Sequence, residues 1–231
     1  MQTHRHFVLR QLIPLLLYIC AIYALPAYAA ESAGTVDAIK GAAWAQRISE
    51  AARKLEKGTL IYQGDVIRTE KDSAVQVAFN DQTKFYLGSN TEMRINKFND
   101  QRGEEGLATH ILKGTFRFVS GLIAKKKPEA MEVGLTVGII GIRGTNVVGE
   151  TDATSATVIL AEPEDATQKT SIEVSNQYGS VTIDEPGYGT EIPDAHSPPS
   201  PARRMRLETI SNIMRSLQSI QRINIPRPRM P

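Results

Sequence analysis

The stretch that decides the fold is Val133-Gly-Leu-Thr-Val-Gly-Ile-Ile-Gly-Ile-Arg-Gly-Thr145. In its first part, large apolar side chains occupy every second position, at Val133, Leu135, Val137 and Ile139. A period of two is typical of a β-strand with one buried face. The pattern therefore predicts one continuous strand over residues 133–140, followed by a turn over residues 141–145.

The turn contains the candidate binding residues of the chain. Gly141 and Gly144 enclose one long charged side chain, that of Arg143. Glycine permits backbone angles or close approaches that a Cβ atom forbids. The Arg143 guanidinium is a candidate for binding an anionic group; the alternative is a structural role, in which it donates hydrogen bonds to carbonyl groups at the strand end. Together with Thr145, these residues form the candidate motif.

Short strands separated by turns fill most of the remaining chain. We expect strands at residues 34–40, 66–69, 74–79, 83–87, 93–95, 108–113, 115–119, 157–160, 170–174 and 180–183, an exposed polar loop at 97–106 and a basic hairpin tip at 125–128. Turn signals recur about every 8–12 residues with no helical period between them, which excludes a parallel α/β architecture. The fold is therefore expected to be all-β, and short strands with regular turns fit both a solenoid and a sandwich.

Residues 48–57 allow two interpretations. They are rich in helix-forming residues and end before Gly58, as a short helix would. The alternative is a β-hairpin excursion in which Leu55 and Leu60 anchor the chain in the core. The sequence leaves both interpretations open.

The first 29 residues have the features of an export signal. Arg5 and Arg10 accompany an apolar run that extends to residue 25, and Ala27-Tyr-Ala29 is a small-x-small cleavage pattern. We expect cleavage after Ala29 and a periplasmic mature chain, with a retained membrane anchor as the alternative. Cys20 is the only cysteine, so the cleaved chain is expected to contain no thiol or disulfide.

Charge divides the expected mature chain into an acidic body and a basic tail. Residues 30–201 contain 18 Lys or Arg and 24 Asp or Glu, whereas residues 202–231 contain seven arginines and one acid. The arginines expected to contact an anionic surface, a partner or the body itself are Arg203, Arg204, Arg206, Arg215 and Arg222.

The domain organisation follows from the same change in composition. An all-β domain at 30–195 is followed by a proline-rich linker at 196–202. Residues 203–231 then form a basic tail with an amphipathic helix, whose apolar positions are Leu207, Ile210, Met214, Leu217 and Ile220.

No set of catalytic or metal-binding residues is recognisable in the sequence. The two histidines after residue 29, His110 and His196, are distant and have no flanking motif, so neither a nucleophile–base set nor a zinc site can be assembled. Glu129 and Glu132 are the only acids considered for glycosidase-type chemistry. No glycine loop precedes a helix, as phosphate binding requires. We expect a non-catalytic protein without a cofactor or metal.

Protein is a better-matched partner than nucleic acid or sugar. The body is acidic and its strands lack a stacking platform for bases. A cell-wall or polysaccharide platform, the alternative function, would use Trp44, Tyr62, Phe85 and Tyr86, which fall on different segments. Contact of the tail helix with anionic lipid is a further alternative.

Five segments in order resemble the FecR domain family. They are Gln-Gly-Asp-Val-Ile-Arg-Thr at 63–69, the alternating strand at 73–81, Leu-Gly-Ser-Asn-Thr at 87–91, Gly114 with the strand after it, and Ile-Arg-Gly-Thr at 142–145. The resemblance covers a core at residues 36–148, with further strands expected at 149–195.

The resemblance implies an all-β, solenoid-like domain outside the cytoplasmic membrane that contacts other proteins during signal transfer. Iron-uptake regulators of this family also have a spanning helix and a cytoplasmic segment that controls a sigma factor. We interpret the N-terminus of this sequence as an export signal instead. Only the extracytoplasmic binding or scaffold role is therefore expected to carry over, with an envelope protein as the partner.

Overall fold

The computed structural model describes residues 31–221 except 102–103, 145 and 164–169. The predicted export signal, Thr145 and Arg222 lie outside the described residues. None of the helices within the described ranges is both long enough and apolar enough to cross a membrane.

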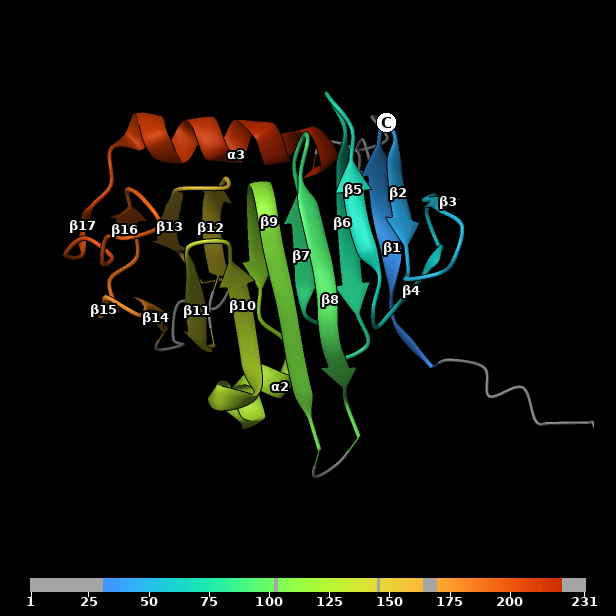
Figure 1. Cartoon of the computed structure of the whole chain (residues 1–231), viewed down its shortest axis with the longest axis horizontal. Helices are drawn as coiled ribbons and strands as arrows, with labels where there is room; N and C mark the ends of the chain where they lie inside the picture. Colours follow the sequence, from blue (N-terminus) through green and yellow to red (C-terminus); the bar gives the residue numbers. More distant parts are fainter. Residues whose placement is uncertain (1–30, 102–103, 145, 164–169, 222–231) are drawn as a thin grey trace, which may run out of the picture. The chain divides into compact units, whose positions relative to one another are not determined.

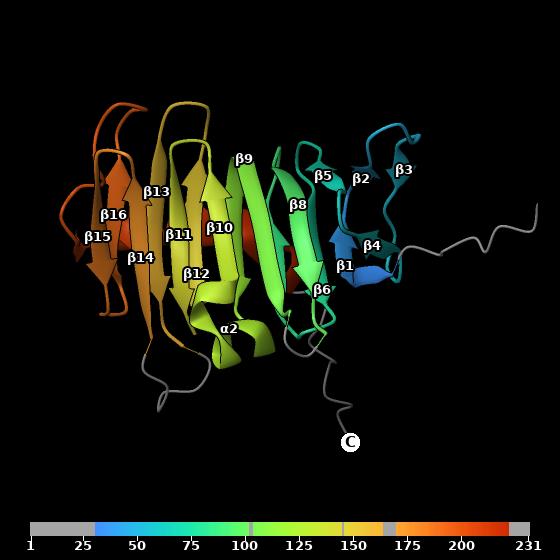
Figure 2. The same ribbon diagram turned by 60° about the horizontal axis from the view of Figure 1, so that its bottom comes forward.

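The strands lie in two layers, which we call layer A and layer B (Figures 1 and 2). Layer A contains, in spatial order, β4 (Leu60–Tyr62), β1 (Ser32–Lys40), β6 (Ala74–Phe79), β7 (Lys84–Leu87), the second half of β9 (Gly106–Val119), β12 (Asn146–Thr151), β13 (Ala156–Ala161), β16 (Tyr188–Ile192) and β17 (Arg203–Arg204). Layer B contains β3 (Arg53–Lys54), β2 (Ala43–Gln46), β5 (Val66–Thr69), β8 (Glu92–Asn99), the first half of β9, β10 (Met131–Leu135), β11 (Gly138–Arg143), β14 (Ser171–Asn176) and β15 (Gly179–Ile183).

The two layers form one continuous mixed sheet. Among the described strands, β9 and β10 pair in parallel and the other pairings are antiparallel. The expected all-β class with a C-terminal helix is confirmed. An open mixed sheet of this kind does not confirm the solenoid-like stack.

β9 joins the layers because it bends at Gly114. Up to Lys113 it pairs with β8 of layer B, and from Gly114 onward it pairs with β12 of layer A. Gly114 has a φ of +106°, and a Cβ atom there would lie 2.5 Å from the Cα of Thr91. Only glycine fits this bend. The two strands expected on either side of Gly114 are therefore one.

The core lies between the layers and is built mainly from aliphatic residues with a cluster of phenylalanines. The Phe79 ring of layer A lies 5.5 Å from the Phe98 ring of layer B, and Phe85 lies 5.3 Å from Phe118. Contact between Phe98 and Phe79 also explains why β8 runs on to Asn99, into the polar stretch that was expected to be a loop from residue 97.

Helix α3 (Leu207–Gln221) covers the outer face of layer A (Figure 1). Its Ile213 and Leu217 pack with Met205 over Tyr86, Val148 and Ile159. The Ser216 hydroxyl donates a hydrogen bond of 2.8 Å to the Thr115 hydroxyl of β9. The amphipathic helix is confirmed, but Leu207 is 79% exposed because the contact with the sheet begins only later in the helix.

The predicted strand over residues 133–140 is a hairpin instead. β10 ends at Leu135, a turn at 136–137 follows, and Leu135 pairs with Gly138 at the start of β11. The turn shifts the alternation by one residue, so Ile140 and Ile142 point into the core while Ile139 is 42% exposed. Regular alternation up to residue 139 concealed the turn, and the expected single strand was wrong.

Two other local expectations also need correction. Residues 48–57 contain the short strand β3 and no helix. Leu55 anchors this excursion in the core, as the hairpin interpretation predicted, but Leu60 is 45% exposed. The expected basic hairpin tip at 125–128 is instead helix α2 (Leu122–Lys126) followed by the 3-10 helix η1 (Pro128–Ala130).

Candidate functional site

The outer face of layer B bears a row of three paired residues from neighbouring strands. Gly141 of β11 is in register with Glu132 of β10 on one side and with Glu173 of β14 on the other. Directly paired residues of antiparallel strands point to the same side of a sheet. The two carboxylates therefore flank a position without a side chain, and their strands lie about 10 Å apart, or two strand spacings.

Gly141 is not required by the backbone or by packing. It carries no left-handed φ, and a Cβ atom built on it would meet only the Glu173 carbonyl oxygen at 3.8 Å and Cβ at 3.9 Å, which is ordinary contact. The expectation that a Cβ atom is forbidden here was wrong. A glycine inside a strand lowers stability relative to residues with side chains. This glycine leaves space on the surface without a local structural reason.

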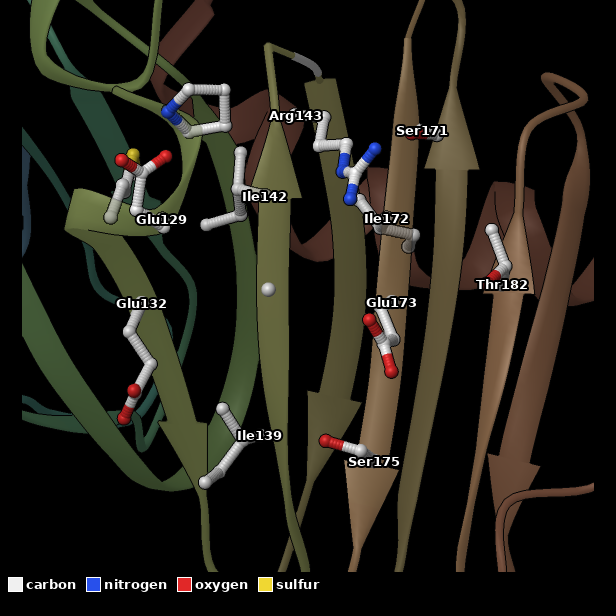
Figure 3. Close-up of a pocket in the computed structure, with 13 residues that line it drawn as sticks. Glu129, Glu132, Ile139, Ile142, Arg143, Ser171, Ile172, Glu173, Ser175 and Thr182 are labelled. Carbon is white, nitrogen blue, oxygen red and sulfur yellow. The ribbon is translucent and has the colours of Figure 1, made fainter.

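The space is part of a groove of about 520 Å³ on the outer face of layer B (Figure 3). Glu132 and Glu173 lie on opposite sides of β11, Ile139 lies toward one end and Arg143 toward the other. Pro128 and Glu129 of η1 also line the groove. It therefore combines an apolar contact with carboxylates and a guanidinium.

A second hollow of about 390 Å³ adjoins the first and shares Glu132 and Ile139 with it. It continues along the sheet to Tyr178, whose side chain is exposed and whose ring lies 6.3 Å from that of His196. The two hollows together form a path along β10, β11 and β14. We call this path the layer B groove.

Arg143 is at the exposed end of β11, in register with Ser171. Its guanidinium forms no hydrogen bond or ion pair with another described residue. The structural alternative, in which Arg143 donates to carbonyl groups at the strand end, therefore finds no such bond among the described residues. Gly144 has a φ of +57°, in the left-handed region that favours glycine, and its expected backbone role is confirmed. A binding role for Arg143 stays a prediction.

The acids near the groove do not resemble a catalytic pair. Glu129 and Glu132 are both solvent-exposed, whereas a general acid needs surroundings that favour its protonated form. Across the described part of the chain, no group of three or more histidine or acidic side chains is placed to hold a metal ion.

His110 lies on β9, in register with Gly134 and lining the second hollow. Burial, and then the Arg94 guanidinium, lower the pKa of His110 below its ordinary value, and the Glu132 carboxylate partly opposes them. The neutral imidazole is therefore favoured in the folded protein.

The described part of the basic tail, residues 203–221, lies at layer A. Arg203 forms an ion pair of 2.7 Å with Glu191 of β16, so one tail arginine contacts the acidic body. Arg204, Arg206 and Arg215 are exposed. None of these four arginines lines the layer B groove.

The aromatic residues considered for a sugar platform are separated by the fold. Phe85 is in the core and Tyr86 is beneath α3. Tyr62 lies under the guanidinium groups of Arg47 and Arg53. Trp44 is exposed, and the other three side chains are buried or half-buried. These residues form no common surface, so the sugar alternative loses its platform.

The Gln63-Gly64-Asp65 turn is built around a buried carboxylate. Asp65 is fully buried and accepts hydrogen bonds from the Arg53 guanidinium and from the Tyr62 backbone N–H at 2.8 Å. Gly64 has a φ of +87°, which the turn requires. This part of the family-like pattern thus has a structural role.

Comparison with known proteins supports the resemblance stated from the sequence. Residues 65–163 match the family model described as FecR protein, so the match includes Glu132, Gly141 and Arg143 and ends before Glu173. Two crystal structures, at 1.65 and 2.50 Å resolution, of a protein described as "a putative anti-sigma factor from Parabacteroides distasonis ATCC 8503" align with 64% of this chain at 12% identity and a TM-score of 0.49. The aligned parts are 64% and 63% of those chains, less than two thirds of their length. No curated protein matches the chain.

Proposed function

We propose that this chain, which carries a FecR domain over residues 65–163, is a non-catalytic module that binds a partner protein through the layer B groove. The proposal assigns the chain to signal transfer or scaffolding in the cell envelope. Export by residues 1–29 to the periplasm is part of it.

The observation that carries the proposal is the empty position at Gly141 between Glu132 and Glu173. A Cβ atom would fit there, yet the strand has none. The cost of a glycine in a strand is accepted elsewhere in this fold where a bend requires it, as at Gly114. At Gly141 no bend or close contact requires glycine, so we attribute the missing side chain to binding: it leaves the surface above the strand accessible to a partner.

The dimensions of the groove suit an extended polypeptide segment. β11 spans Gly138–Arg143, and six residues of a strand extend over about 20 Å. A bound segment of similar length would contact Tyr178 and Ile139 at one end and Arg143 at the other. Polar and apolar contacts together are typical of protein-binding surfaces.

The proposal is tested by comparing charge-reversed variants in quantitative capture from envelope extracts of the native cells. The groove variant combines Glu132→Lys with Glu173→Lys. The control combines Glu150→Lys with Glu208→Lys, which changes net charge equally at exposed positions away from the groove. Loss of specific proteins from the groove variant but not from the control is expected. Equal capture by both variants would contradict the proposal.

A further inference from the structure

We propose that the layer B groove selects a segment with a lysine or arginine that inserts over Gly141, between Glu132 and Glu173. This inference rests on the proposed function and specifies the chemistry of the partner. The bound segment is extended and lies on the face of the sheet.

The preference for a cation follows from the two carboxylates. Neither the Glu132 nor the Glu173 carboxylate forms a hydrogen bond or ion pair with another described residue. Both project from the same face, on either side of the open position. An ammonium or guanidinium group placed there can donate charge-assisted hydrogen bonds to both carboxylates.

The residues on either side of Gly141 extend the pattern. Ile139 and Arg143 lie two positions away along β11, on the same face and about 6.6 Å from Gly141. An extended segment repeats its side chains with the same spacing. The complementary segment therefore has an apolar residue, then the cation, then an acid, at alternate positions: apolar-x-Lys/Arg-x-Asp/Glu, or the same order reversed.

The surface itself is open for such contact. α3 covers the outer face of layer A, whereas on layer B η1 borders the groove through Pro128 and Glu129. Glu132, Ile139 and Glu173 are exposed. Exposed Ile139 and Tyr178 supply apolar contact beside the charged groups. The carboxylates beside Gly141 and the guanidinium of Arg143 fix the position of the bound segment, because a shift by two residues would place like charges together.

The test is selection of a random nine-residue peptide display library on the purified full chain. Enrichment of the apolar–basic–acidic spacing is expected. Glu132→Gln combined with Glu173→Gln should reduce binding of the enriched peptides about tenfold, as should Arg143→Gln for peptides with the acid. The control, Glu150→Gln combined with Glu208→Gln, removes the same charge and should leave binding unchanged.

Three other outcomes would overturn the inference, and they differ in their effect on the proposed function. Peptides that lack a basic residue but are lost on Gly141→Val would leave the groove as a binding site with another specificity. Peptides that are unaffected by Gly141→Val bind elsewhere and would contradict both proposals. Absence of any enrichment would overturn the peptide specificity, while the envelope capture experiment would still decide the function.

Discussion

Glu132 and Glu173 are both register partners of Gly141, one on each side of β11. The family match ends at residue 163, so one carboxylate lies inside the matched segment and the other comes from the strand that follows it. The groove is thus made jointly by the FecR-like part of the chain and by β14.

Gly141→Val should preserve the fold. The added Cβ atom makes only ordinary contacts, and valine favours extended structure. We therefore expect the unfolding free energy to stay the same or to rise by up to about 1 kcal/mol, with an unchanged or higher melting temperature. Gly149→Ala is the matched comparison, because its Cβ atom would lie 2.6 Å from the Thr157 carbonyl oxygen and the Phe116 ring. We expect that variant to lose about 1–3 kcal/mol. Thermal denaturation measures the stability of both variants. A large loss of stability in Gly141→Val would show that Gly141 has a structural role.

Asp65→Ala should destabilise the folded chain by about 3 kcal/mol. The substitution leaves the Arg53 guanidinium and the Tyr62 N–H without their buried acceptor. Glu50→Ala, which removes an exposed partner of Arg47, should change stability by less than about 1 kcal/mol. Urea denaturation measures both. Similar values for the two variants would mean that the buried carboxylate contributes little.

Leu217→Ala should loosen α3 from layer A. Leu217 is buried over the outer face of that layer, and removing such a side chain typically costs about 2–3 kcal/mol. Arg215→Ala, on the exposed side of the same helix, should have no measurable effect on the melting temperature. Calorimetry of both variants tests whether the helix is part of the folded unit. Equal melting temperatures would indicate that it is not.

The pKa of His110 should lie below its ordinary value of 6.5, and it should fall further in Glu132→Gln because Glu132 raises it. Arg94→Gln should shift it upward. A folded pKa below the unfolded value means that the contribution of His110 to stability is complete above pH 6.5 and is lost as the pH falls through the folded pKa. NMR titration of the imidazole measures the shifts, and His110→Gln should remove this part of the pH dependence. A pKa at or above 6.5 contradicts the prediction.

Local patterns in the sequence were sufficient for the fold class and many strands. Alternation placed β6 and β7, and the three-and-four spacing placed α3. The turn at residues 136–137 could not be found in this way, because the apolar alternation continues through it as far as Ile139. Leu55 is buried whereas Leu60 is exposed, although their surroundings in the sequence are similar. The difference comes from tertiary packing, which local sequence does not show.

The candidate site was only half predictable. Gly141 and Arg143 stood out because glycines enclose an arginine, and Glu132 was noticed for a different chemistry. Glu173 carried no local signal. Its place beside Gly141 depends on the pairing of β11 with β14, which joins residues far apart in the chain. Sheet register, which one sequence does not determine, is what assembles the groove.

Site-specific photo-crosslinking in native cells tests the central claim most directly. A photoreactive residue at position 139, at the exposed Ile139 of the groove, is compared with one at Ser211 on the exposed side of α3. The account predicts a discrete crosslink to another protein from position 139 that disappears when Gly141→Val is added, with folding unchanged. A crosslink from position 211 alone, or one from 139 that survives Gly141→Val, would contradict binding through the groove.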